Sequence, residues 1–179
     1  DATKAKRIVG MAVTAAPLWA DTPIAERADA LRRVAKYLRD AKHELARLMA
    51  EEMGKPLREG LAEVEKSAGC AEYYADNGAQ FLAAETLASD ASHSYVKYQP
   101  LGTVLGILPW NAPVWLALRF MAPALMAGNT CIMKADPNVP RTAVALIAAF
   151  HEAELPGGVA LNLPITTDLI GEIIDHPGI

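Results

Sequence analysis

The first half of the chain carries apolar residues at helical spacing, with charged residues between them. The recurring apolar positions are Leu31, Val34, Leu38, Leu45 and Leu48. Pro23 stands where a first helical turn begins, and Gly54-Lys55-Pro56 combines a C-cap glycine with a helix-breaking proline. The pattern therefore predicts one helix over residues 23–53 and a second amphipathic helix over residues 57–81.

The pattern changes near Thr86, from helical periodicity to short strands. Residues 94–99 alternate around Tyr95, Val96 and Tyr98, which predicts an exposed strand that forms half of a hairpin. Further strands are expected at 103–108, 130–133 and 159–163, with helices at 114–126, 140–152 and 166–174. This alternation predicts an α/β fold: N-terminal helices and a β-hairpin lead into a partial Rossmann-like parallel sheet with right-handed crossovers. The Gly-x-Gly-x-x-Gly fingerprint is absent after the first strand of this sheet.

The amino-acid composition argues against several classes of function. The 179 residues are 52% hydrophobic and carry a formal net charge of −4, so the basic surface typical of nucleic-acid binding is missing. The longest apolar stretch, residues 112–127, is interrupted by Pro113, Arg119 and Pro123, and is too broken to span a bilayer. The N-terminus does not read as a signal peptide. We therefore expect a cytoplasmic protein with neither a nucleic-acid nor a membrane partner.

The two cysteines indicate neither a metal site nor a nucleophile. Cys70 and Cys131 lack the Cys-x-x-Cys spacing of metal sites, and they fall in the second predicted helix and the second strand of the sheet. Both are expected to be small core residues. The four histidines are scattered singly along the chain, and no metal is expected.

A stiff polar loop follows the first strand of the predicted sheet. Pro109-Trp110-Asn111-Ala112-Pro113 lies at the carboxyl end of that strand, where ligands bind in open α/β sheets. The two prolines restrict the loop, which suits a side chain that must hold still. The amide of Asn111 can stabilise an oxyanion that develops on a carbonyl. The alternative is a turn asparagine beside a packing tryptophan, and the spacing by itself does not decide between them.

Arg119 is the only charged residue between Trp110 and Met133, inside a strongly apolar helix. An arginine in such a place needs an anionic partner, either a carboxylate of the protein or a ligand. Its planar guanidinium suits bidentate binding of a carboxylate.

Several short motifs follow one another in a recognisable order. They are Glu52-Met-Gly-Lys-Pro56, Glu63-Val64, Tyr73-Tyr74, residues 100–113 ending in Pro-Trp-Asn-Ala-Pro, residues 122–130, Lys134 and Leu155-Pro-Gly-Gly-Val159. Each motif is weak by itself, but the set covers nearly the whole chain. In this order and at these separations it resembles the aldehyde dehydrogenase family, whose corresponding loop reads Pro-Trp-Asn-Phe-Pro.

The resemblance implies roles for individual residues. Asn111 would donate to the oxyanion of a thiohemiacetal formed from the aldehyde substrate. Leu108, Pro109 and Trp110 would wall the cofactor site, and Lys134 would hydrogen-bond the adenosine ribose of NADP or NAD.

Three positions, compared with the family pattern, bear on the identity of the substrate and of the cofactor. The succinate-semialdehyde branch of the family carries an arginine at the position of Arg119 that contacts the substrate carboxylate, which implies succinate semialdehyde as the substrate. Pro137 stands where the family often has a glutamate that binds both ribose hydroxyls, and without that carboxylate a 2′-phosphate meets less repulsion, which favours NADP. Thr166 and Thr167 replace the usual glycine-rich turn, and they either donate to a cofactor phosphate or act as ordinary N-caps.

The resemblance also implies a division of the chain. Residues 1–85 would form a helical segment that packs on the cofactor domain, residues 86–100 an oligomerisation hairpin, and residues 101–179 an incomplete cofactor domain. The nucleophilic cysteine and the glutamate base would lie in a catalytic domain outside this chain, which is expected to be inactive by itself and to belong to a homodimer or homotetramer. The alternatives are a non-catalytic nucleotide-binding or interaction module derived from the same fold and, less favoured, a relative that reduces acyl phosphates.

Overall fold

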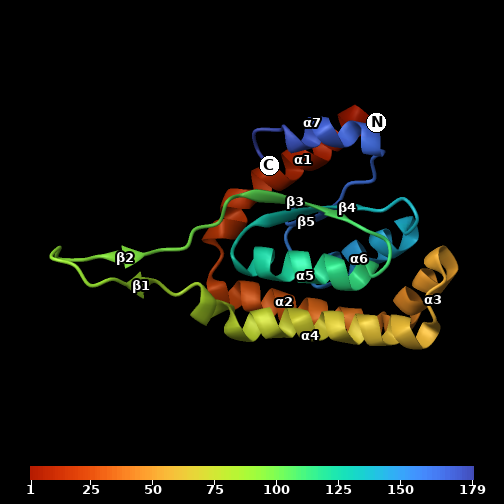
Figure 1. Ribbon diagram of the computed structural model, residues 1–179, viewed down its shortest axis with the longest axis horizontal. Coiled ribbons are helices and arrows are strands. Elements are labelled where there is room, and N and C mark those ends of the chain that lie inside the picture. The colour runs from red at the N-terminus through yellow and green to blue at the C-terminus, as the bar shows by residue number, and fades with distance from the viewer.

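The computed structural model describes all 179 residues and contains a parallel sheet with helices on both faces (Figure 1). The strands β3 (Thr103–Leu108), β4 (Thr130–Ala135) and β5 (Ala160–Asn162) lie in the order β3-β4-β5. Both neighbouring pairs are parallel, so the three strands end at the same edge of the sheet. The α/β class expected from the alternating pattern is confirmed.

The helices that connect these strands cover one face of the sheet. They are α5 (Pro113–Met126) and α6 (Pro140–Glu152), and each begins with a proline. Gly106 of β3 allows α5 to lie close, because a Cβ there would come within 2.6 Å of the Phe120 ring. Beneath α5 and α6 lies a further layer, formed mainly by α2 (Ile24–Asp40) and α4 (Leu57–Phe81) (Figure 1).

The opposite face of the sheet is covered by α1 (Ala2–Asp21), a helix that the sequence pattern did not predict (Figure 1). Asp1 caps it, because its carboxylate accepts a 2.8 Å hydrogen bond from the backbone N–H of Lys4. The buried residues at this interface are Ala5, Val9, Ala12, Ile132, Leu161, Leu163 and Ile173. The helix buries mostly alanine, which gives a weak periodic signal, and Pro17 within it weakens that signal further.

The prediction of one helix over residues 23–53 is wrong in one respect, because the segment forms two helices. The second, α3 (Lys42–Met53), is separated from α2 by Ala41. Buried leucines continue at seven-residue spacing across this break, so periodicity alone did not reveal the change of direction. The predicted C-cap is confirmed: Gly54 has φ +75°, the left-handed conformation that favours glycine. The helix predicted over residues 57–81 is confirmed as α4.

The predicted hairpin is present but short. Its strands β1 (Glu85–Thr86) and β2 (Tyr95–Val96) pair antiparallel, and together they extend as an arm away from the rest of the protein (Figure 1). Of the strand predicted over residues 94–99, only Tyr95 and Val96 form a regular strand. The residues on either side of them are irregular. Leu87 and Tyr95 are exposed on this arm.

The last predicted helix, over residues 166–174, is divided in the structure. A 3₁₀ turn, η1 (Thr167–Leu169), leads into the five-residue helix α7 (Ile170–Ile174), which lies beside α1 (Figure 1). None of the helices in the structure combines the length and the apolar character that crossing a membrane requires.

Candidate functional site

The candidate site residues lie at the edge of the sheet where β3, β4 and β5 end. Asn111 follows β3, Lys134 is the penultimate residue of β4, and Thr166 follows β5 by four residues. Parallel strand order brings these three segments to one edge, which is the usual ligand-binding edge of an open α/β sheet.

The loop between β3 and α5 presents Asn111 to solvent. Asn111 is exposed and its side chain makes no hydrogen bond within the chain, so both amide groups are free for a ligand. Trp110 beside it is 45% exposed. The loop is held at its far end, where Pro113 begins α5 and the N–H of Leu116 donates to the carbonyl of Ala112 over 2.9 Å.

The first turn of α5 is capped by a residue distant in sequence. One carboxylate oxygen of Glu63, on α4, accepts hydrogen bonds from the backbone N–H groups of Val114 at 2.9 Å and Trp115 at 3.1 Å. The other oxygen pairs with the ammonium of Lys55. Only 6% of the Glu63 side chain is exposed. The sequence motif that contains Glu63 did not predict this contact. The available signal was its position on the buried face of α4, beside Val64.

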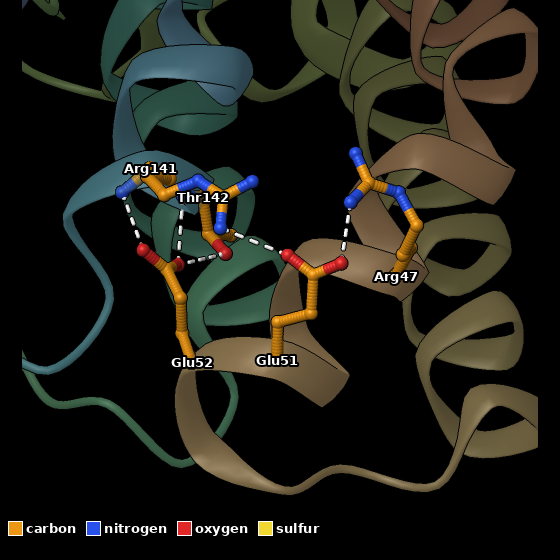
Figure 2. A network of polar contacts seen from close by, with 5 residues as sticks. All are labelled: Arg47, Glu51, Glu52, Arg141 and Thr142. Atoms are coloured by element: carbon orange, nitrogen blue, oxygen red, sulfur yellow. Dashed lines mark hydrogen bonds and ion pairs between the residues drawn. The ribbon is translucent and has the colours of Figure 1, made fainter.

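The first turn of α6 is capped in the same way by Glu52 at the end of α3 (Figure 2). Its carboxylate accepts from the N–H of Arg141 at 2.6 Å, the N–H of Thr142 at 2.9 Å and the Thr142 hydroxyl at 2.6 Å. Figure 2 also shows Glu51 between the side chains of Arg47 and Arg141. Hydrogen bonds from Arg47 and Arg141 lower the pKa of Glu51 below its usual value.

These two caps bear on where a dinucleotide can bind. Helix N-termini after sheet strands are common phosphate sites because their free N–H groups and dipoles attract anions. Here Glu63 and Glu52 already occupy the first turns of α5 and α6 with carboxylates. At both helix starts a carboxylate therefore already accepts from the N–H groups that a phosphate would use. Thr166 and Thr167 after β5 are exposed, and their hydroxyls have no partner within the chain.

Lys134 is a charged residue at this edge that has no partner within the chain. It was expected just after a buried strand, but it lies within β4, opposite Ile107 of β3. It is only 6% exposed and forms neither a hydrogen bond nor an ion pair with another residue. No side chain of this chain accepts from its ammonium, so the three N–H donors are open to an acceptor from a ligand. Nearby Asp136 accepts a 2.9 Å hydrogen bond from the N–H of Asn138, which orders the turn before α6.

The residues of this chain do not enclose a cofactor-sized cavity at the strand ends. The hollow between the ends of β3 and β4, lined by Leu108, Pro109 and Ala135 among others, has a volume of about 10 Å³. A hollow of about 860 Å³ lies between α1 and the segment around Gly157, and none of the candidate residues lines it. The candidate residues therefore form an open wall.

Arg119 lies on the exposed side of α5 and forms no ion pair within the chain. A second cation lies on the neighbouring helix α4. The ammonium of Lys66 is 3.8 Å from the centroid of the Trp115 ring, and Trp115 precedes Arg119 by one turn of α5. Burial raises the pKa of the Cys70 thiol, and both Arg119 and Lys66 are near enough to oppose that rise. The sequence pattern did not predict that Lys66 belongs to this cationic surface.

Neither cysteine is suited to nucleophilic catalysis. Cys131 on β4 is fully buried, and its burial strongly raises the pKa of the thiol. Cys70 is partly buried, with its sulfur 4.0 Å from the carbonyl of Leu118, and its pKa is also raised. A reactive cysteine needs a lowered pKa and access to the substrate.

Comparison with known proteins gives a consistent result over the whole chain. A family model described as the aldehyde dehydrogenase family matches residues 1–179. A probable succinate-semialdehyde dehydrogenase (NADP+) of Synechocystis is 42% identical over 85% of this chain and 34% of the relative. A succinate semialdehyde dehydrogenase (NAD(P)+) of Escherichia coli is 38% identical over 87% of this chain and 34% of the relative. The crystal structure of the Streptococcus pyogenes succinic semialdehyde dehydrogenase with NADP+ superimposes with a TM-score of 0.92 at 30% identity, covering 97% of this chain and 38% of that one.

Proposed function

The chain belongs to the aldehyde dehydrogenase family, and on that premise we propose that the intact protein oxidises succinate semialdehyde to the carboxylic acid with NADP+ or NAD+. The chain spans about a third of the length of its curated relatives, 34% in both cases given above. The activity proposed is therefore that of the whole protein. The observation that carries the proposal is the unpartnered Asn111 amide on a stiff loop at the ligand-binding edge of the sheet.

We assign Asn111 the stabilisation of negative charge. When a cysteine thiolate adds to the aldehyde carbonyl, the carbonyl oxygen becomes an oxyanion, and the Asn111 amide N–H donates to it. Neither Cys70 nor Cys131 fits the nucleophile, because burial raises both pKa values. We therefore propose that the nucleophile and the general base come from the part of the protein outside these residues.

The substrate assignment rests on Arg119. Arg119 is exposed on α5, the helix that follows the Asn111 loop, and its guanidinium has no carboxylate partner within the chain. An aldehyde that carries a carboxylate at its other end supplies that partner, and bidentate binding then orients the aldehyde group. Lys66, held over Trp115, adds a second positive charge to the same surface. The names of the relatives given above support the same substrate.

A nicotinamide cofactor would accept the hydride released as the aldehyde is oxidised. The residues present fit such a group in one respect: the largely buried Lys134 side chain has no acceptor within the chain, so its N–H groups can donate to a ribose hydroxyl. Leu108, Pro109 and Trp110 offer an apolar and aromatic wall, and we place a phosphate at Thr166 and Thr167. These threonines remain the free donors because Glu52 and Glu63 close the other two helix starts.

We favour NADP+ over NAD+. Pro137 leaves no carboxylate where a glutamate often binds both ribose hydroxyls, so a 2′-phosphate meets less repulsion. The Synechocystis relative is named as an NADP+ enzyme, the Streptococcus pyogenes enzyme was crystallised with NADP+, and the Escherichia coli relative is named as an NAD(P)+ enzyme. The exposed hairpin arm formed by β1 and β2 supports a further proposal, that residues 86–100 take part in association into a homodimer or homotetramer.

The test is a steady-state assay of the full-length protein with succinate semialdehyde and either NADP+ or NAD+, following absorbance of the reduced cofactor. We expect turnover, and we expect Asn111→Ala to lower kcat by about 10²–10³-fold, as loss of one oxyanion donor does. A full-length protein that binds NADP+ but oxidises no aldehyde would favour the non-catalytic nucleotide-binding module.

A further inference from the structure

We propose that Glu63 is a positioning residue for Asn111: its carboxylate fixes the first turn of α5 and, through that turn, the loop that holds the Asn111 amide. The inference rests on the proposed function, because it concerns the placement of the proposed oxyanion donor. Glu63 itself faces the backbone of α5, so it acts through Asn111 and not on the substrate.

The first turn of α5 depends on Glu63 because it has no local cap. The residue before the helix is Ala112, whose side chain cannot accept a hydrogen bond. The free N–H groups at a helix start need acceptors when they are buried. Val114 is fully buried, and its N–H and that of Trp115 both donate to the same oxygen of Glu63. A single carboxylate thus fixes the two residues that follow Pro113.

The carboxylate is itself held in place. Lys55 pairs with its second oxygen, and only 12% of the Lys55 side chain and 6% of the Glu63 side chain are exposed. Lys55 follows Gly54, whose left-handed conformation ends α3 and turns the chain towards α4. An ion pair buried to this extent has a strict geometry, because neither charge can turn to water without losing its partner.

The distance from this cap to Asn111 is short and stiff. Asn111 precedes Val114 by three residues, and Pro113 between them has a fixed φ. The Asn111 side chain has no hydrogen bond of its own that would hold it in the absence of substrate. Its position is therefore set by the backbone on either side, which is β3 before it and the Glu63-bound turn after it. A misplacement of about 1 Å in a catalytic group costs on the order of 10²-fold in rate.

The test is a double-mutant cycle in the full-length enzyme, with Glu63→Ala and Asn111→Ala singly and together. We expect Glu63→Ala to lower kcat by about 10–10²-fold with little change in the KM for the aldehyde, and to cost almost nothing further once Asn111 is gone. Glu63→Gln keeps an acceptor oxygen, so it should lower kcat less than Glu63→Ala does. This loss too should appear only in enzymes that retain Asn111. If Glu63→Ala does not fold, the cycle is run with Glu63→Gln.

Glu52→Ala is the matched control, because Glu52 caps α6 as Glu63 caps α5. We expect Glu52→Ala to lower kcat by the same factor in the enzyme with Asn111 and in the Asn111→Ala enzyme. If the losses from Glu63→Ala and Asn111→Ala multiply as those from Glu52→Ala do, Glu63 does not act through Asn111 and the inference is overturned. If Asn111→Ala itself leaves kcat unchanged, the proposed donor fails, and the inference falls with it.

Amide hydrogen exchange provides a readout that does not depend on catalysis. Loss of the Glu63 carboxylate should speed exchange at the amides of Val114 and Trp115, while the amide of Thr142 on α6 keeps its wild-type rate. Unchanged exchange at Val114 and Trp115 would overturn the inference even if aldehyde oxidation is established.

Discussion

Replacing Arg119 by glutamine should change the preference between charged and neutral aldehydes. The exposed guanidinium has no partner within the chain, so a substrate carboxylate would gain hydrogen bonds to a charged group. Such bonds contribute about 1.5–3 kcal/mol, and exposure to water favours the lower half of that range, about 1.5–2 kcal/mol. At 1.36 kcal/mol per tenfold, we expect kcat/KM for succinate semialdehyde to fall by about 12- to 30-fold. Lys66 nearby keeps the loss from being larger.

The assay compares kcat/KM for succinate semialdehyde with that for butanal, the uncharged four-carbon aldehyde, at saturating cofactor. The ratio of the two is the informative quantity, because effects on folding or cofactor binding cancel in it. Arg7→Gln is the matched control: Arg7 is an exposed arginine on α1, on the opposite face of the sheet from α5. A loss of equal size for both aldehydes with Arg119→Gln, or no loss for either, would refute the assignment of Arg119 to the substrate carboxylate.

Three further predictions concern capping, packing and thiol reactivity. Glu52→Ala should lower the free energy of unfolding, measured by urea denaturation, by about 2–4 kcal/mol, because it removes a helix cap and leaves buried donors of Thr142 unpaired. A loss below about 0.5 kcal/mol, the size typical of an ordinary surface substitution, would contradict this. Gly106→Val should destabilise by about 1–3 kcal/mol in thermal melts, because its side chain meets the Phe120 ring, and Phe120→Ala in the same chain should relieve the loss. Cys131 should resist iodoacetamide in the native protein and react in urea, as followed by peptide mass spectrometry; native labelling at the unfolded rate would show that β4 is accessible.

Local sequence patterns predicted most of the elements because those elements depend on nearby residues. Gly54 and Pro56 marked the end of α3 and the start of α4, and the apolar runs at 103–108 and 130–133 marked two strands of the sheet. The helix α1 was missed because it buries alanines, whose contribution to hydrophobic periodicity is small. The break at Ala41 was missed because buried leucines stay in register across it.

The candidate site was predictable only where its residues are consecutive. The loop from Pro109 to Pro113 could be read directly, since its stiffness and its place after a strand are local properties. The caps from Glu63 and Glu52 could not, because they join residues 51 and 90 positions apart. The sequence alone also could not tell that Lys134 is both buried and unpaired, since that depends on the helix and strands that surround β4.

The positions of the two caps along the chain have a consequence for synthesis on the ribosome. Glu63 is translated 51 residues before Val114, so at about 5–20 residues per second it precedes the helix that it caps by roughly 3–10 s. The helices α3 and α4 have left the ribosomal tunnel, or are leaving it, when the first turns of α5 and α6 are made. Each of these turns emerges without a local cap and meets an acceptor that already exists. The N-terminal helices thus serve as a template on which the later half of the chain completes its hydrogen bonding.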